Sequence, residues 1–302
     1  MRTLKNLMRL FLLLFCVSPS SLSQDTLKIF RFPPIDQVDV IVKVGITAVQ
    51  GALRYEYEIK SLPTSKQSIW AIDIPFNILP ARVQSPEGWF AIVGGRTPAI
   101  GWGADDSLHY IHPNQTQPLF SYDSKGIPSI TTIYIRGWAE PPELTFEPDS
   151  VVGEDVLEAS KKVLTIAAAR PPTPFIHLAF LDTLLSYTRQ SVQLGWLKST
   201  RDDDCDEDEQ PHDGVAKNIE KRIEKAKKEL TKGDSVKSRK ELEKLVKKVE
   251  KIYKKSEEAD KKKHDSNIVM TSEAYALLKY NAEYLIYRLP DRSLKRRARE
   301  KD

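Results

Sequence analysis

Cysteine and histidine are scarce in this chain of 302 residues, which has two of the former and five of the latter. Two cysteines are too few for a disulfide-stabilised scaffold or for a zinc site built from cysteine ligands. The sequence also lacks a Gly-x-Ser-x-Gly nucleophile motif, a phosphate-binding glycine loop and a His-Glu-x-x-His metal motif. Gly101 and Gly103 are interpreted as turn glycines because no helix follows them. We therefore expect a protein that is not an enzyme and needs no cofactor, and an exported hydrolase has the least support.

Long hydrophobic runs are absent after residue 23, so we expect no transmembrane segment in the mature chain. Residues 1–23 combine a basic start, eight apolar residues at 10–17 and a short polar end. As a helix, the apolar run spans about 12 Å, well short of a bilayer core of about 30 Å. This layout predicts a secretory signal peptide that is cleaved before Gln24. An uncleaved membrane anchor and a lipoprotein site at Cys16 are the alternatives.

Cleavage would leave Cys205 as the only cysteine, which cannot form an internal disulfide. A chain exported without disulfides is typical of a bacterial exterior. We expect the mature protein to be secreted, periplasmic or held at the cell surface.

Charge is divided unevenly along the chain. Residues 24–150 contain 10 basic and 14 acidic residues, whereas residues 151–302 contain 33 and 28. The density of charged residues is about twice as high in the second half, which favours two unlike domains. A protein this close to neutrality is not a typical nucleic-acid binder.

Alternation of apolar and polar residues dominates the first half. Residues 55, 57 and 59 are apolar or aromatic, and the residues between them are charged; residues 70–74 alternate in the same way after a turn. These two runs predict an antiparallel pair. Shorter runs of the same kind occupy residues 89–93, 99–102, 119–122 and 130–135. Together they predict an antiparallel β-sandwich over residues 24–148.

A set of motifs in this half resembles a β-sandwich module of secreted bacterial proteins. The motifs are Tyr55-x-Tyr57, Pro86-x-Gly88-Trp89 and Ile111-x-Pro113, in the order found in that module. Asn114 stands where the module usually has glycine. The module has no well-known activity, so the resemblance implies a fold rather than a function.

Four of the five tryptophans lie in the first half, and they allow two interpretations. Trp89 and Trp102 are candidate ligand-binding residues, because flat indole rings stack on sugar rings. Alternatively, the tryptophans fill the sandwich core, as large aromatic side chains often do.

The second half changes to helical periodicity after a proline-rich stretch. Residues 149–174 include Arg170-Pro-Pro-Thr-Pro174 and are predicted to form a linker. Residues 175–290 carry four amphipathic segments, of which the last has Thr271 as its expected N-cap. The sequence therefore predicts a two-domain α+β chain, with the β-sandwich followed by a small antiparallel helical bundle.

The helical segments resemble the FIMAH-type module at the C-termini of secreted bacterial proteins. The resemblance is carried by Leu194-Gly-Trp-Leu197, Lys232-Gly-Asp234 and the run Met270-Thr-Ser-Glu-Ala-Tyr-Ala-Leu-Leu278. It implies a noncatalytic accessory module that makes contacts with other molecules.

An acidic insertion at residues 199–214 departs from that module. Its carboxylates Asp202, Asp204, Asp206 and Asp213 fall at positions 1, 3, 5 and 12 of a calcium loop. The glycine expected at position 6 and the glutamate expected at position 12 are missing, however. A weak Ca²⁺ site, a solvated acidic loop and a redox or thiolate–metal role for Cys205 are the alternatives.

The basic tail at residues 291–302 is interpreted as a solvated terminus or as a contact with an anionic surface. From all of this, we expect a noncatalytic accessory protein that contacts cell-surface or extracellular proteins, with the helical bundle as its docking element. The alternative is a carbohydrate-binding protein that uses the sandwich aromatics to bind polysaccharide.

Overall fold

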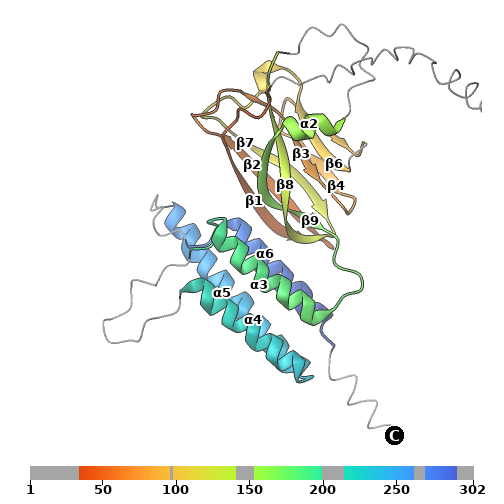
Figure 1. Cartoon of the computed structure of the whole chain (residues 1–302), viewed down its shortest axis with the longest axis vertical. Coiled ribbons are helices and arrows are strands. Elements are labelled where there is room, and N and C mark those ends of the chain that lie inside the picture. The colour runs from red at the N-terminus through yellow and green to blue at the C-terminus, as the bar shows by residue number, and fades with distance from the viewer. Residues whose placement is uncertain (1–33, 96–97, 141–152, 199–213, 262–268, 291–302) are drawn as a thin grey trace, which may run out of the picture.

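The computed structural model describes residues 34–95, 98–140, 153–198, 214–261 and 269–290. Two antiparallel sheets form a sandwich in the N-terminal part, and a bundle of helices lies against one end of it (Figure 1). The first sheet has the order β1 (Val40–Val49), β2 (Ala52–Ser61), β7 (Thr116–Ser124), β4 (Ala81–Gln84). The second has the order β5 (Trp89–Val93), β6 (Ala99–Ala104), β3 (Ile69–Pro75), β8 (Ile127–Gly137), β9 (Lys161–Ala169).

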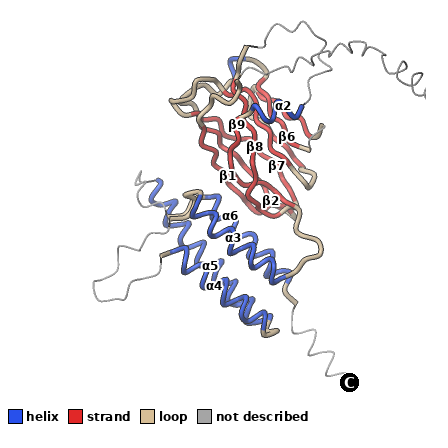
Figure 2. Tube along the Cα trace, in the orientation of Figure 1, coloured by secondary structure: helices blue, strands red, loops and turns tan. Residues whose placement is uncertain are grey.

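Two short helical segments accompany the strands, and four longer helices make up the bundle (Figure 2). The 3₁₀ turn η1 (Ser107–His109) precedes β7, and α2 (Gly153–Ala159) precedes β9. The bundle consists of α3 (His177–Gln193), α4 (Val215–Thr231), α5 (Ser235–Lys261) and α6 (Ser272–Arg288). Within the described ranges, no helix combines the length and apolar character needed to cross a membrane.

The alternating pattern identifies the inward face of the strands correctly. Tyr55, Tyr57 and Ile59 of β2 are all buried in the core between the sheets. The predicted pairing of residues 54–59 with residues 70–74 is wrong, because β2 pairs with β1 and β7, and β3 pairs with β6 and β8. Alternation shows which face of a strand is buried but not which strand lies beside it.

The sandwich extends beyond the predicted boundary at residue 148. Strand β9 lies within residues 149–174, the predicted linker, and pairs with β8 from Lys161 to Ala169. The Tyr57 hydroxyl donates to the Ile166 carbonyl (2.7 Å), and the Tyr122 hydroxyl accepts from the backbone N–H of Ala168 (3.1 Å). The second half of β9 is buried on both sides, so it lacks the alternation that reveals a half-exposed strand.

The four helices match the segments that their apolar stripes predict. Thr271 is the N-cap residue of α6, as expected, although its side chain makes no capping hydrogen bond. Helix α5 is longer than its apolar stripe suggests and runs for 27 residues. Leu242, Leu245 and Val249 place its apolar stripe in the bundle core.

Helix α6 covers the outer edge of β1, which would otherwise be an unpaired edge strand. The backbone N–H of Val44 donates to Oε1 of Glu273 (3.0 Å), and the hydroxyl of Tyr280 donates to the carbonyl of Ile46 (2.8 Å). Both bonds satisfy backbone groups that point away from β2. Exposed strand edges readily pair with other chains, so α6 protects this one.

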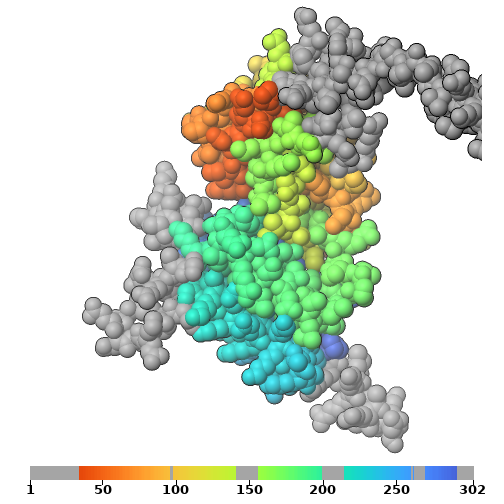
Figure 3. All heavy atoms as spheres, viewed as in Figure 1, coloured from red at the N-terminus to blue at the C-terminus, as the bar shows by residue number. Residues whose placement is uncertain are grey.

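The same helix joins the two hydrophobic cores. Ala276 and Leu277 are fully buried and pack with the core of the sandwich, while Leu278 and Leu285 pack with the core of the bundle. Nδ2 of Asn281 donates to the carbonyl of Pro128 in β8 (2.8 Å). In the space-filling view the bundle abuts the sandwich (Figure 3). The sandwich and the bundle therefore share an interior surface and are not joined by a linker alone.

Candidate functional site

A groove of about 450 Å³ lies on the outer face of the five-stranded sheet. It runs over β6 and β3, with β5 on one side and β8 and α2 on the other. Most of its lining is apolar or aromatic, and the polar side chains that line it are few. The side chains that shape it are Trp70, Asp73, Phe90, Ile92, Tyr134 and Arg136.

Small residues form the floor of this groove. The strand register places Phe90 opposite Gly103 and Ile92 opposite Gly101, and both glycines lie within β6. The interpretation of Gly101 and Gly103 as turn glycines is therefore wrong. A Cβ atom at Gly103 would lie 2.8 Å from the Phe90 ring, and one at Gly101 would lie 3.0 Å from an Asp73 carboxylate oxygen. The absence of side chains here lets both neighbours lie across β6.

The strand β5 borders the groove with exposed apolar side chains. Phe90 is 46 % exposed and Ile92 is 60 % exposed, although large apolar side chains are usually buried. Val93, on the other face of the strand, is also exposed. β5 is an edge strand that pairs only with β6 in its sheet. No strand among the described residues pairs with its outer backbone groups, and Phe90 and Ile92 are exposed beside them.

The two charged side chains of the groove, Asp73 and Arg136, lie next to each other. Nη2 of Arg136 lies 2.8 Å from Oδ2 of Asp73. Burial raises the pKa of Asp73, and the charge of Arg136 partly opposes this effect. A carboxylate held by a neighbouring guanidinium is a positioned ion pair rather than a free acid or base.

Aromatic side chains gather around Arg136 at one end of the groove. The guanidinium lies 4.8 Å from the centroid of the Trp70 ring. The Trp138 ring meets Trp70 edge to face at 6.1 Å and is 42 % exposed. Tyr110 packs against Trp138 with its ring tilted by 42°. The rings are not coplanar, so they form a compact cluster and not a flat platform.

Trp89 and Trp102, the candidate ligand-binding residues of the sequence analysis, lie in the core of the sandwich. Trp89 and Trp102 are 6 % and 1 % exposed, and both pack edge to face against Phe120. Their indole N–H groups donate to the carbonyls of His109 (3.0 Å) and Gln84 (3.1 Å). With their rings enclosed in this way, Trp89 and Trp102 have no free face on which a sugar could stack.

The calcium hypothesis concerns residues that the structure does not describe. Asp202, Asp204, Asp206 and Asp213 all lie outside the described residues, as does Cys205. Across the described ranges, no group of three or more histidine, cysteine, aspartate or glutamate side chains is arranged to hold a metal ion.

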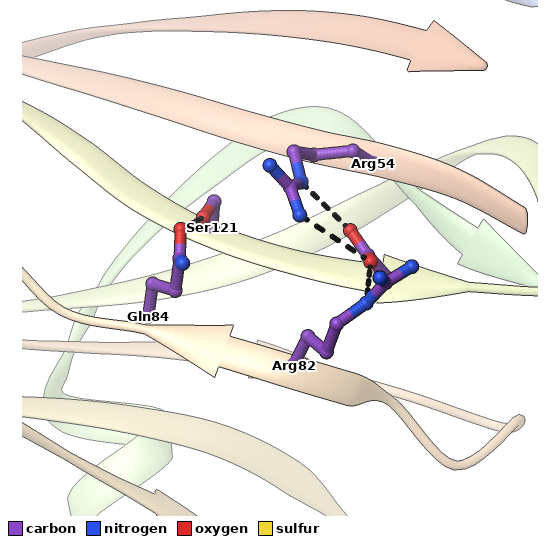
Figure 4. Close-up of polar contacts among 5 residues, drawn as sticks. Arg54, Arg82, Gln84 and Ser121 are labelled. Carbon is purple, nitrogen blue, oxygen red and sulfur yellow. Dashed lines mark hydrogen bonds and ion pairs between the residues drawn. The ribbon is translucent and has the colours of Figure 1, made fainter. Parts of the chain in front are cut away.

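A second polar cluster lies on the four-stranded sheet and has a structural explanation. The carboxylate of Asp123 in β7 forms ion pairs with Arg54 of β2 (2.8 Å) and with Arg82 of β4, and Ser121 bonds to Gln84 beside it (Figure 4). The hydrogen bond from Arg54 is the main cause that lowers the pKa of Asp123. These contacts join three strands, so we interpret the cluster as a tie between them.

Sequence reasoning missed the groove because its residues are ordinary strand residues. The signal in the sequence is the pair of large apolar residues Phe90 and Ile92 in one strand and the pair of glycines at 101 and 103 in the next, which face each other across the two strands. That signal depends on knowing that β5 and β6 are paired.

Comparison with models of protein families finds no match, and comparison with curated proteins finds none either. The resemblances of the sandwich and of the helical module therefore remain unconfirmed. Among solved structures, the chain is similar to an uncharacterized protein from Nocardia farcinica that has an immunoglobulin-like fold. The two are 18 % identical with a TM-score of 0.26, over 40 % of this chain and 95 % of that one.

Proposed function

We propose that this protein is a noncatalytic interaction protein, and that the groove binds an extended, apolar segment of a partner protein. The exposure of Phe90 and Ile92 along an edge strand, beside a floor of glycines, is the observation that carries this proposal. An incoming strand can pair with the outer backbone groups of β5, and every second side chain then lies beside Phe90 and Ile92 at the border of the groove.

The lining of the groove favours protein over carbohydrate as the ligand. Sugars need several polar groups to bond their hydroxyls, whereas the lining of this groove is mainly apolar or aromatic and has only two charged side chains, Asp73 and Arg136. Stacking also needs a flat exposed ring, and the Trp70–Trp138 pair meets edge to face. The alternative of polysaccharide binding has no support at Trp89 and Trp102.

Two further parts of the proposal come from the sequence. The N-terminal pattern supports export of the chain, so the partner is expected to be an extracellular or cell-surface protein. The resemblance to a FIMAH-type module supports an accessory role. In this proposal the groove is the docking element, and the bundle, which α6 joins to the sandwich, supports the binding domain.

Selection from a displayed library of random peptides tests this function. We expect the full chain to enrich peptides with apolar residues at alternate positions. Substitution Ile92→Lys places a charge in the groove and should weaken binding of the enriched peptides at least tenfold. The matched control is Leu108→Lys, because Leu108 is also exposed but lies outside the groove.

Two results would count against the proposal. One is enrichment of peptides without apolar residues, and the other is equal binding by the Ile92→Lys and Leu108→Lys variants. Binding of purified polysaccharides that these variants leave unchanged would favour a carbohydrate ligand at another surface.

A further inference from the structure

A second pocket, of about 370 Å³, lies where the sandwich meets the bundle. Its walls come from the edge strand β1, the C-terminal part of α5 and the N-terminal end of α6, and Trp196 from the segment after α3 completes them. It shares no lining residue with the groove on the five-stranded sheet. Its volume falls in the range of small-molecule sites, which extends from about 300 to 1,000 Å³.

Four charged side chains line this pocket, and none of them forms an ion pair with a described residue. Glu273 of α6 is only 4 % exposed, so it lies at the inner side of the pocket. Glu257 and Lys261 of α5 and Lys43 of β1 are exposed and lie at its outer side. The inner side therefore carries a negative charge, and the outer side carries two lysines against one glutamate.

The inner side of the pocket offers several hydrogen-bond acceptors. Oε1 of Glu273 accepts from the backbone N–H of Val44 (3.0 Å), and Oε2 has only a long bond from the hydroxyl of Ser272 (3.4 Å). Oγ1 of Thr271 is buried without a hydrogen-bond partner among the described residues, which is rare in folded proteins. The carbonyl of Val42 points away from β2 as the N–H of Val44 does, because outward backbone groups recur at every second residue of an antiparallel edge strand.

Aromatic side chains form part of the wall. Trp196 and Tyr253 both line the pocket, and the Tyr253 ring stacks on the ring of Tyr275 with 4.1 Å between their centroids. Burial raises the pKa of the Tyr253 hydroxyl, and the charges of Glu257 and Glu273 raise it further, so both carboxylates lie near this ring. Aromatic faces attract cations. Carboxylates beside aromatic rings therefore favour a positively charged group inside the pocket.

We propose that this pocket binds a short zwitterionic peptide, with its ammonium group at Glu273 and its carboxylate at Lys43 and Lys261. A primary ammonium has three N–H donors, and the carboxylate of Glu273, the hydroxyl of Thr271 and the carbonyl of Val42 can accept them. Hydrogen bonds that involve ionised groups are stronger than neutral ones. The peptide would also supply the partner that the buried hydroxyl of Thr271 lacks.

The separation of the charges favours a peptide over a free amino acid. An amino acid carries its ammonium and carboxylate groups on one carbon atom, whereas an extended dipeptide spans roughly 7 Å. The ligand has to reach from buried Glu273 to exposed Lys43 and Lys261. A metal ion is a poor match, because the described residues contain no group of three or more acidic, histidine or cysteine side chains that could hold one.

Titration calorimetry of the full chain with leucyl-leucine tests the proposal. The N-acetylated and the C-amidated forms of this dipeptide each lack one charge and should bind about tenfold more weakly. Glu273→Gln should also weaken binding of leucyl-leucine about tenfold, while its amide oxygen can still accept from the N–H of Val44. Thr271→Val should weaken binding about threefold without affecting folding, because the Thr271 hydroxyl bonds to no described residue.

The matched control is Glu258→Gln, which removes an exposed carboxylate of α5 outside the pocket and should change affinity by less than about twofold. Ile92→Lys in the groove should leave leucyl-leucine binding unchanged, so failure at this pocket and failure at the groove are distinguishable. The proposal would be overturned if leucyl-leucine does not bind, if either blocked form binds as tightly, or if free leucine binds more tightly. Equal losses in the Glu273→Gln and Glu258→Gln proteins would overturn it as well.

Discussion

The shared interior surface at α6 predicts that the sandwich and the bundle unfold together. Leu277 is the most direct place to perturb this coupling, because it is a residue of α6 that is fully buried in the sandwich core. Truncation of a buried leucine to alanine removes contacts and leaves a cavity, which typically costs 2–5 kcal/mol. Leu277→Ala should therefore lower the free energy of unfolding by about 3 kcal/mol.

Urea unfolding followed by two signals measures this effect in both parts at once. Four of the five tryptophans lie in the sandwich, so their fluorescence reports on it, and circular dichroism at 222 nm reports mainly on the helices. With a urea dependence of about 3 kcal/mol per molar, the midpoint should fall by about 1 M in both signals. The variant Leu242→Ala, in the bundle core, should shift both signals in the same way.

Two separate unfolding transitions would contradict this coupling. If the fluorescence midpoint stayed constant in the Leu277→Ala protein while the helical signal shifted, α6 would not contribute to the stability of the sandwich.

Three further predictions concern the sandwich itself. Asp123→Ala should lower the free energy of unfolding by about 2 kcal/mol at neutral pH. Because ion pairs lower the pKa of Asp123 in the folded protein, the natural chain should lose this stabilisation as the pH falls below about 4. Acid denaturation curves should therefore show a smaller decrease in the free energy of unfolding for the variant than for the natural chain. Gly103→Ala should displace the Phe90 ring and weaken binding of library-selected peptides, whereas Gly45→Ala, whose new Cβ meets nothing within 4 Å, should leave their affinity unchanged in a titration. Trp102→Ala should cost about 3–5 kcal/mol in chemical denaturation, and a loss below 1 kcal/mol would contradict the core position of this ring.

The architecture of this protein is readable from the sequence wherever an element has one buried and one exposed face. Tyr55, Tyr57 and Ile59 reveal β2 by alternation, and the stripe through Leu242, Leu245 and Val249 reveals α5 by its helical period. Strand β9 is not recognisable from the sequence as part of the sandwich, because its second half is buried on both sides. Periodicity requires contrast between two faces, and a fully buried segment has none.

The candidate site was less predictable than the fold. Composition draws attention to tryptophan, but Trp89 and Trp102 serve the core, where their size and their bonded indole N–H groups suit them. The groove arises from the register between β5 and β6, which places Phe90 beside Gly103. Register depends on contacts between residues far apart in sequence, so local patterns do not determine it.

Amide hydrogen exchange in the presence of a library-selected peptide tests the binding function most directly. If an extended segment pairs with the edge of the five-stranded sheet, the amides of β5 should exchange more slowly in the complex, and those of α4 and α5 should be unaffected. Protection confined to the helical bundle, with β5 unchanged, would contradict the assignment of the groove as the binding site.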